Sequence, residues 1–103
     1  MQTISSQRYI DDAIVEAKAA AADFEVFVSP AFEFDGEVVR VVLDGHHSLA
    51  AAKLAGVAPV YVEYTATEHD AIALLEAGAY EDFLMATHLG DDYYNVETGM
   101  CVW

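Results

Sequence analysis

A glycine at position 45 separates two segments with opposite conformational preferences. The run 38–43 before it is rich in β-branched valine, which favours a strand, and the near-continuous valines indicate burial on both faces. The run 46–55 after it is rich in alanine and leucine, which favour a helix. Gly56 predicts the end of that helix, because glycine tolerates the left-handed conformation that closes helices. The segment therefore predicts a central strand, a tight turn and a helix.

Polar side chains gather at this turn. A helix start presents unpaired backbone N–H groups and a partial positive charge, which suit an anion, most often phosphate. Gly45 lets the backbone turn sharply or lie close to a ligand, and Ser48 can donate a hydrogen bond from the first helical turn. The alternative is that Asp44 and Ser48 only cap the helix, while His46 and His47 are solvated.

The string Asp44-Gly45-His46-His47-Ser48, which continues through an alanine-rich helix to Gly56, resembles the ParB/sulfiredoxin superfamily. Its first four residues match the Asp-Gly-His-His of the branch that includes free serine kinases. The resemblance covers roughly Tyr9 to Tyr64, since a helix before the string and a strand after it fall in the expected places. Ser48 replaces the arginine that closes the family motif.

The resemblance implies a nucleotide site that binds ATP or CTP with Mg²⁺, and a nucleotide-dependent phosphotransferase or hydrolase activity. It places His47 near the phosphates and Asp44 near Mg²⁺ or an acceptor hydroxyl. The implied catalytic set is Asp44, His46 and His47, and the ligand-binding set is Gly45, His46, His47 and Ser48. His46 occupies the position of the sulfiredoxin cysteine and of the ParB glutamate, so sulfinic acid reduction and ParB-style CTP hydrolysis are not expected.

Arg40 interrupts the valine-rich strand. A buried arginine needs an acceptor, and one interpretation pairs it with Glu25 or Glu33 across the sheet. The other interpretation adds Arg40 to the ligand-binding residues, as a cation that is aimed at a phosphate. No metal site is predicted, because Asp44, His69 and His88 would have to converge and their spacing does not indicate that they do.

The formal net charge is −14, with 18 acidic residues against 4 lysines and arginines. Direct binding to DNA or RNA is not expected, because phosphate contacts need clustered basic side chains. The acidity permits a solvated surface, a site for a basic protein partner, or mimicry of nucleic acid. The second hypothesis is therefore a catalytically inactive ParB-like domain that binds a protein, as an antitoxin, an inhibitor or a nucleic-acid mimic does.

The remaining pattern predicts one α+β domain over residues 1–103, with a small mixed sheet and packed helices. Asp35-Gly36 is the strongest hairpin-turn signal. The expected elements are a lead-in strand or loop over 1–5, a helix over 7–22 capped by Ser6, strands over 24–28, 32–34, 37–43 and 57–64, a helix capped by Thr67, a helix over 80–89, and an edge strand or flap over 100–103.

The chain is expected to work in the cytoplasm without a membrane. Cys101 is the only cysteine, which excludes an internal disulfide and suits a reducing compartment. No apolar run approaches the ~20 residues of a membrane span. A basic region followed by an apolar core is not found at the N-terminus, so no signal peptide is expected.

Overall fold

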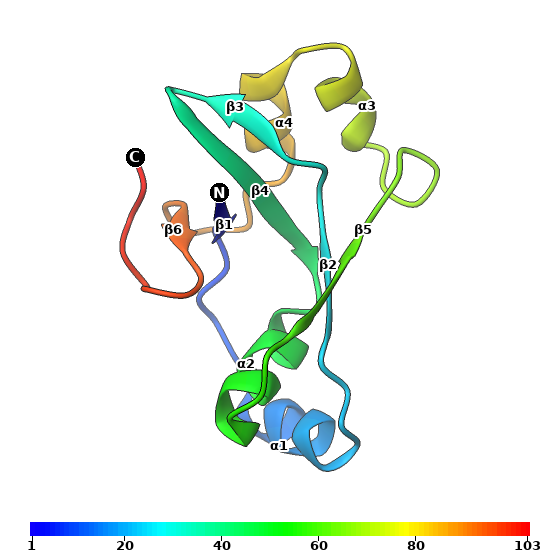
Figure 1. Cartoon of the computed structure of the whole chain (residues 1–103), viewed down its shortest axis with the longest axis vertical. Coiled ribbons are helices and arrows are strands. Elements are labelled where there is room, and N and C mark those ends of the chain that lie inside the picture. Colours follow the sequence, from blue (N-terminus) through cyan, green and yellow to red (C-terminus); the bar gives the residue numbers. More distant parts are fainter.

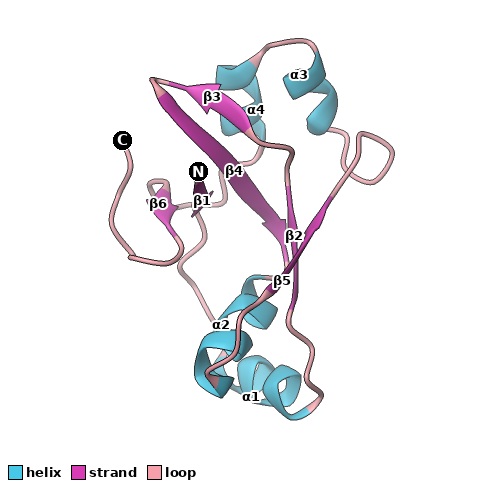
Figure 2. Ribbon diagram, in the orientation of Figure 1, coloured by secondary structure: helices cyan, strands magenta, loops and turns pink.

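The computed structural model describes all 103 residues, and the fold is a small α+β arrangement of one mixed sheet and four helices (Figures 1 and 2). This confirms the predicted fold class. The elements are β1 (Gln2–Ser5), α1 (Asp12–Ala20), β2 (Glu25–Val28), β3 (Phe32–Phe34), β4 (Glu37–Asp44), α2 (His46–Ala55), β5 (Val60–Glu63), α3 (Ile72–Glu76), α4 (Tyr80–Ala86) and β6 (Tyr94–Asn95).

Strand β4 is the centre of the sheet, as its valines predict. The strand order is β5-β2-β4-β1-β6, and β3 pairs with β4 beside this path. Strand β4 runs parallel to β1 and antiparallel to β2 and β3. Its first half pairs with β1 and β3, and its last residues pair with β2, so this eight-residue strand connects both halves of the molecule.

The hairpin between β3 and β4 is confirmed. Asp35 and Gly36 form the turn, with φ angles of 53° and 78°. Both central residues are therefore left-handed, which is the geometry that matches the twist of a two-residue hairpin. Glycine adopts it without cost and aspartate tolerates it.

The sheet is mixed, as expected, and the connection from β4 through α2 to β5 is not a parallel crossover. Strand β5 pairs in parallel with β2, and β2 is antiparallel to β4. Strand β5 therefore runs opposite to β4, with β2 between them. The ten-residue helix α2 connects these two non-adjacent strands at one end of the molecule (Figure 1).

Two predicted helix starts are wrong. Helix α1 begins at Asp12, and its cap is Asp11, whose carboxylate accepts from the N–H groups of Ala13 and Ile14. Helix α3 begins at Ile72 and has no side-chain cap. In both cases a chain segment with its own hydrogen bonds precedes the helix, and local propensity alone does not reveal it.

The residues that were predicted as caps have other partners. Ser6 is buried, and its hydroxyl accepts from the backbone N–H of Leu89 at 2.7 Å. The hydroxyl of Thr67 is hydrogen-bonded to the hydroxyl of Thr65. The N–H and the hydroxyl of Thr65 both donate to the Glu68 carboxylate.

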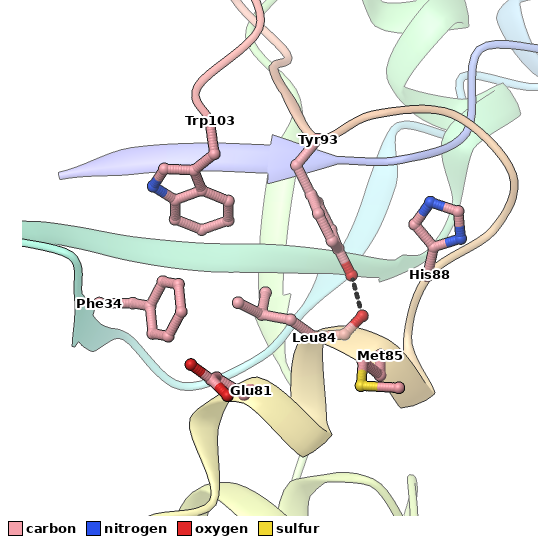
Figure 3. Close-up of a pocket in the computed structure, with 7 residues that line it drawn as sticks. All are labelled: Phe34, Glu81, Leu84, Met85, His88, Tyr93 and Trp103. Atoms are coloured by element: carbon pink, nitrogen blue, oxygen red, sulfur yellow. Dashed lines mark hydrogen bonds between the residues drawn. The ribbon is translucent and has the colours of Figure 1, made fainter.

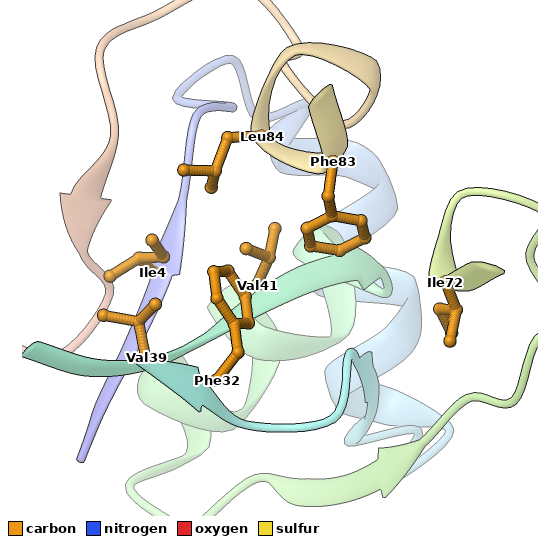
Figure 4. Packing of buried hydrophobic residues seen from close by; sticks show 7 residues of the cluster. All are labelled: Ile4, Phe32, Val39, Val41, Ile72, Phe83 and Leu84. Carbon is orange, nitrogen blue, oxygen red and sulfur yellow. The ribbon is translucent and has the colours of Figure 1, made fainter. Parts of the chain in front are cut away.

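The core has two parts, to which β4 contributes from its two opposite faces. Figure 4 shows the larger cluster, in which Val39 and Val41 of β4 meet side chains from β1, β3, α3 and α4. The smaller cluster contains Val42 of β4 together with Leu49 of α2 and residues from β2. Successive strand residues point to opposite faces, so one valine-rich strand supplies both clusters. The larger cluster consists of Ile4, Phe32, Val39, Val41, Ile72, Phe83 and Leu84.

The molecule is elongated, with extents of 40 × 30 × 22 Å. Helices α1 and α2 pack together at one end, and β3, α3 and α4 lie at the other end (Figure 1). The C-terminal segment returns beside β6 through a bridge between Tyr94 and Cys101, so the expected edge strand is reduced to one pair of residues. None of the four helices has the length and apolar character that crossing a bilayer requires.

Candidate functional site

The turn between β4 and α2 contains Gly45 as the N-cap of the helix, with φ at 88°. A Cβ atom at this position would lie 2.7 Å from the carbonyl oxygen of Glu25 and 3.1 Å from the Cα of Val26. Real side chains do not accept such distances to a backbone. The glycine is therefore required by the close packing of the turn on β2, and the close approach predicted for a ligand is made by the protein's own strand.

The start of α2 carries no side-chain cap. The Oδ1 atom of Asp44 accepts from the N–H of Gly45 at 2.7 Å, one residue before the helix begins. The Ser48 hydroxyl is buried and donates to Oδ1 of Asp23 at 3.4 Å. The interpretation in which Asp44 and Ser48 cap the helix is therefore wrong, and the first N–H groups of α2 have no side-chain acceptor. Ser48 does not point its hydroxyl to a ligand.

A hollow of about 240 Å³ lies beside this helix start, and no apolar side chain lines it. It brings together three of the predicted side chains with two that the sequence did not indicate, Gln7 and Lys18. The predicted members are Asp44, His46 and His47, and Gly45 supplies backbone. Helix α1 contributes the lysine because α1 packs along α2.

His46 is buried, with 7% of its surface exposed. Its Nε2 atom lies 2.6 Å from the hydroxyl of Ser5, which also accepts from the N–H of Gln7. Burial lowers the pKa of His46, the nearby Asp44 carboxylate partly offsets that effect, and His47 adds to it. The ring is therefore neutral at pH 7, and it fixes α2 against the end of β1.

His47 has a different attachment. Its Nε2 atom accepts from the backbone N–H of Asp11 at 3.2 Å, just before α1. Because Nε2 is the acceptor, the proton of the neutral ring lies on Nδ1, which leaves that N–H as a donor. The two adjacent histidines thus contact different elements, as their adjacency in the sequence predicts.

Lys18 is the basic side chain of the hollow. Its ammonium group donates to Oδ2 of Asp23 at 2.9 Å in the one ion pair of the chain. The Lys18 ammonium holds the pKa of Asp23 below its usual value. Asp23 also accepts from Ser48, so the lysine is linked through Asp23 to α2. The sequence places Lys18 in the last turn of α1. Only the contact between α1 and α2 shows that this position lies beside the hollow.

Arg40 lies outside the hollow. Its guanidinium stacks 4.2 Å from the centre of the Tyr61 ring, and its Nε donates to Oγ1 of Thr3 at 2.8 Å. It makes no ion pair with Glu25 or Glu33. Asp44 follows Arg40 by four positions along the strand, which is a distance of about 13 Å. Arg40 therefore links β1, β4 and β5, and it lies apart from the other predicted ligand-binding residues.

The other two histidines do not reach the hollow. His69 accepts from the N–H of Ala71 at the start of α3, and His88 lies beside Tyr93 near α4. No group of three or more histidine, cysteine, aspartate or glutamate side chains is arranged to hold a metal ion. Any metal in the hollow would therefore need ligands that the protein does not supply.

Comparisons with models of protein families, with curated proteins and with solved structures find no match to this chain. The resemblance to the ParB/sulfiredoxin superfamily stays a prediction from the motif at positions 44–56.

Proposed function

We propose that this protein binds a small phosphate-bearing compound in the hollow at the Gly45 turn. The observation that carries the proposal is a wholly polar hollow at the uncapped start of a ten-residue helix, lined by a lysine and two imidazoles. The motif resemblance adds the chemical class, which is a nucleotide such as ATP or CTP.

The groups around the hollow favour an anion in three ways. The helix dipole places about half a positive charge at the start of α2. Lys18 adds an ammonium group, although the Asp23 carboxylate balances part of its charge, and an imidazole N–H of His47 adds a neutral donor. Charge-assisted hydrogen bonds of this kind are about twice as strong as neutral ones.

Asp44 is the carboxylate of the hollow, and it repels a bare phosphate. A magnesium complex of the ligand removes this conflict, because Mg²⁺ is usually bound by one or two carboxylates together with substrate phosphates. Asp44 would hold the metal, and Mg²⁺ would neutralise phosphate charge there. This arrangement also fits the absence of a metal site made by protein ligands alone.

The volume limits how much of the ligand is enclosed. Pockets that bury whole small molecules measure about 300–1,000 Å³, and this hollow measures about 240 Å³. The phosphate end of a nucleotide would therefore occupy the hollow, while the sugar and base lie outside. We expect weak discrimination between ATP and CTP for this reason.

Catalysis in this proposal is phosphoryl transfer or hydrolysis, with a separate role for each residue. Where it does not hold Mg²⁺, Asp44 would orient an acceptor hydroxyl or water through its carboxylate. His47 contacts the phosphate, and buried His46 positions the turn through its bond to Ser5. We place this activity in the cytoplasm, since Cys101 is exposed and unpaired.

Calorimetric titration with Mg²⁺ complexes of ATP, ADP and CTP tests the proposal. We expect similar affinities for ATP and CTP, and a loss of about ten-fold in Lys18→Gln and in His47→Ala, because each removes a donor to phosphate. Arg40→Gln is the matched control, since it removes a cation that lies outside the hollow. No heat at millimolar nucleotide, or an equal loss in the Arg40 variant, would refute the proposal.

A further inference from the structure

A second hollow lies between β3, α4 and the C-terminal segment (Figure 3). Strand β3 and helix α4 lie at the end of the molecule opposite to α1 and α2 (Figure 1). Its volume is about 550 Å³, and most of its lining is apolar. The walls include Phe34 of β3, Leu84 and Met85 of α4, and the aromatic rings of Tyr93 and Trp103. We call it the aromatic groove.

The walls of the aromatic groove are fixed by contacts within the protein. The Trp103 ring meets Phe34 edge-on with centroids 5.1 Å apart, and Tyr93 with centroids 5.9 Å apart. The Tyr93 hydroxyl donates to the carbonyl of Leu84 at 2.7 Å (Figure 3). A pre-formed groove loses little entropy when a partner binds, which favours recognition.

The groove leaves large apolar side chains in water. Met85 is 77% exposed and Trp103 is 42% exposed, although both line the groove. Apolar surface that is grouped around a hollow marks an interaction site more often than scattered apolar residues do. Methionine and tryptophan are also common in protein interfaces, because one is adaptable and the other offers a large contact area.

The charge around the groove identifies the partner. Glu81 lines it, and Asp82, Asp91 and Asp92 are exposed on α4 and on the loop that leads to Tyr93. No lysine or arginine occurs after position 53. The four basic side chains of the protein all lie earlier in the chain, and none of them lines the groove. Arg8 and Lys53 donate to the carbonyls of Gly99 and Val96, Lys18 donates to Asp23, and Arg40 donates to Thr3. None of the carboxylates around the groove forms an ion pair with a lysine or an arginine, so the groove has an acidic border, and His88 is the one imidazole in its lining.

A second copy of the chain is a poor occupant of this groove, because two chains of net charge −14 repel each other. At this groove the acidic border also repels nucleic acids and phosphate compounds. A basic polypeptide satisfies both the apolar walls and the acidic border, since its apolar side chains can fill the groove while its cations meet the carboxylates.

We propose that the aromatic groove docks a cationic amphipathic segment of a partner protein. One or two large apolar side chains of the segment insert between Phe34, Met85 and Trp103. Lysines or arginines beside them lie against Glu81 and the acidic loop. This site is separate from the phosphate hollow, so either proposal can fail while the other stands.

The single tryptophan of the chain makes the groove directly observable. Trp103 fluorescence is followed while a tryptophan-free helical peptide of leucine and lysine is added to the whole protein at low salt. We expect a saturable blue shift, because the inserted leucines exclude water from the indole ring. A peptide of leucine and glutamate, and a peptide of serine and lysine, are expected to bind at least about ten-fold more weakly.

Two matched pairs of variants separate groove binding from general attraction to an acidic protein. Met85→Ser is expected to weaken binding about five-fold, whereas Leu54→Ser, which changes an apolar residue on α2 that is also mostly exposed (64%), leaves binding unchanged. Glu81→Gln is expected to weaken binding about three-fold at low salt and less at high salt, whereas Glu16→Gln on α1 has little effect.

Three results would overturn the proposal. The first is an unchanged Trp103 spectrum at saturating cationic peptide. The second is equal binding of the leucine–glutamate peptide, which would show that charge does not select the occupant. The third is an equal loss of affinity in both members of each pair, which would show attraction to the whole surface.

Discussion

At the scale of single residues, Gly45 has the least freedom to change. The substitution Gly45→Ala forces a side chain into left-handed backbone and places its Cβ against the carbonyl of Glu25 at 2.7 Å. Left-handed strain costs about 1–2 kcal/mol, and overpacking adds about 1–3 kcal/mol. We expect the free energy of unfolding to fall by about 3 kcal/mol in urea titrations.

Gly56→Ala is the control for the Gly45 substitution. Gly56 ends the same helix with φ at 70°, but no atom lies within 4 Å of its Cβ position. Its substitution is expected to cost only the strain, about 1–2 kcal/mol. If the two variants lose the same stability, the close packing of the turn on β2 is not important for folding.

His46 gives the protein a pH-dependent stability that a neutral amide does not have. Burial holds its folded pKa below the usual 6.5, so the unfolded chain binds a proton more readily. The stability that His46 contributes is therefore complete above about pH 6.5 and is lost as the pH falls through the folded pKa. His46→Gln keeps a polar group near the Ser5 hydroxyl but does not titrate.

Urea unfolding of the wild type and of His46→Gln between pH 7.5 and 5 checks this expectation. Both proteins share the same carboxylates, so only the difference between their unfolding free energies reports on His46. We expect this difference to shrink as the pH falls. A constant difference would contradict a buried neutral imidazole at this position.

At the scale of elements, the cap of α1 decides where the helix starts and supports the candidate site. Asp11 accepts from the N–H groups of Ala13 and Ile14, and its own N–H donates to His47. We expect Asp11→Ala to lower the free energy of unfolding by about 1 kcal/mol, as measured by urea titration. Asp11→Asn retains the capping oxygen, and its stability is expected to lie close to that of the wild type. A full loss in the Asn variant would mean that the carboxylate charge matters more than the cap.

The sequence predicted the elements whose signals are local. Strand β4, the Gly45 turn, α2 and the Asp35-Gly36 hairpin each depend on neighbouring residues, and each forms where it was expected. The start of α1 could not be predicted, because Ser6 is a good cap residue by its local sequence. Its hydroxyl instead accepts from the N–H of Leu89, which lies far along the chain. The direction of β5 likewise depends on β2, which precedes it by many residues.

The candidate site was predicted only in its contiguous part. Asp44, His46 and His47 line the hollow together, since they belong to one turn. Lys18 reaches the hollow through the packing of α1 on α2, which no spacing in the sequence specifies. A cation in a buried strand needs an acceptor, and the sequence left a glutamate across the sheet and a ligand phosphate as the alternatives for Arg40. Its acceptor is Thr3 and its ring partner is Tyr61.

At the scale of the whole molecule, the net charge of −14 acts against the compact state. Only one ion pair, Lys18–Asp23, is present to be weakened by salt, and both side chains are partly exposed. Surface ion pairs add little stability, so the dominant effect of salt is to screen repulsion among the carboxylates. The Debye length falls from about 30 Å at 0.01 M to about 3 Å at 1 M salt.

We therefore expect the melting temperature to rise by several degrees between 0.01 M and 0.5 M NaCl, as measured by circular dichroism. The double variant Glu16→Lys/Glu63→Lys tests the cause, because each replacement of an exposed glutamate by lysine removes two units of negative charge. Its melting temperature is expected to be higher than that of the wild type at low salt and to depend less on salt. If the variant and the wild type respond equally to NaCl, the rise comes from a general effect of salt on apolar burial, and charge repulsion does not limit the stability of this fold.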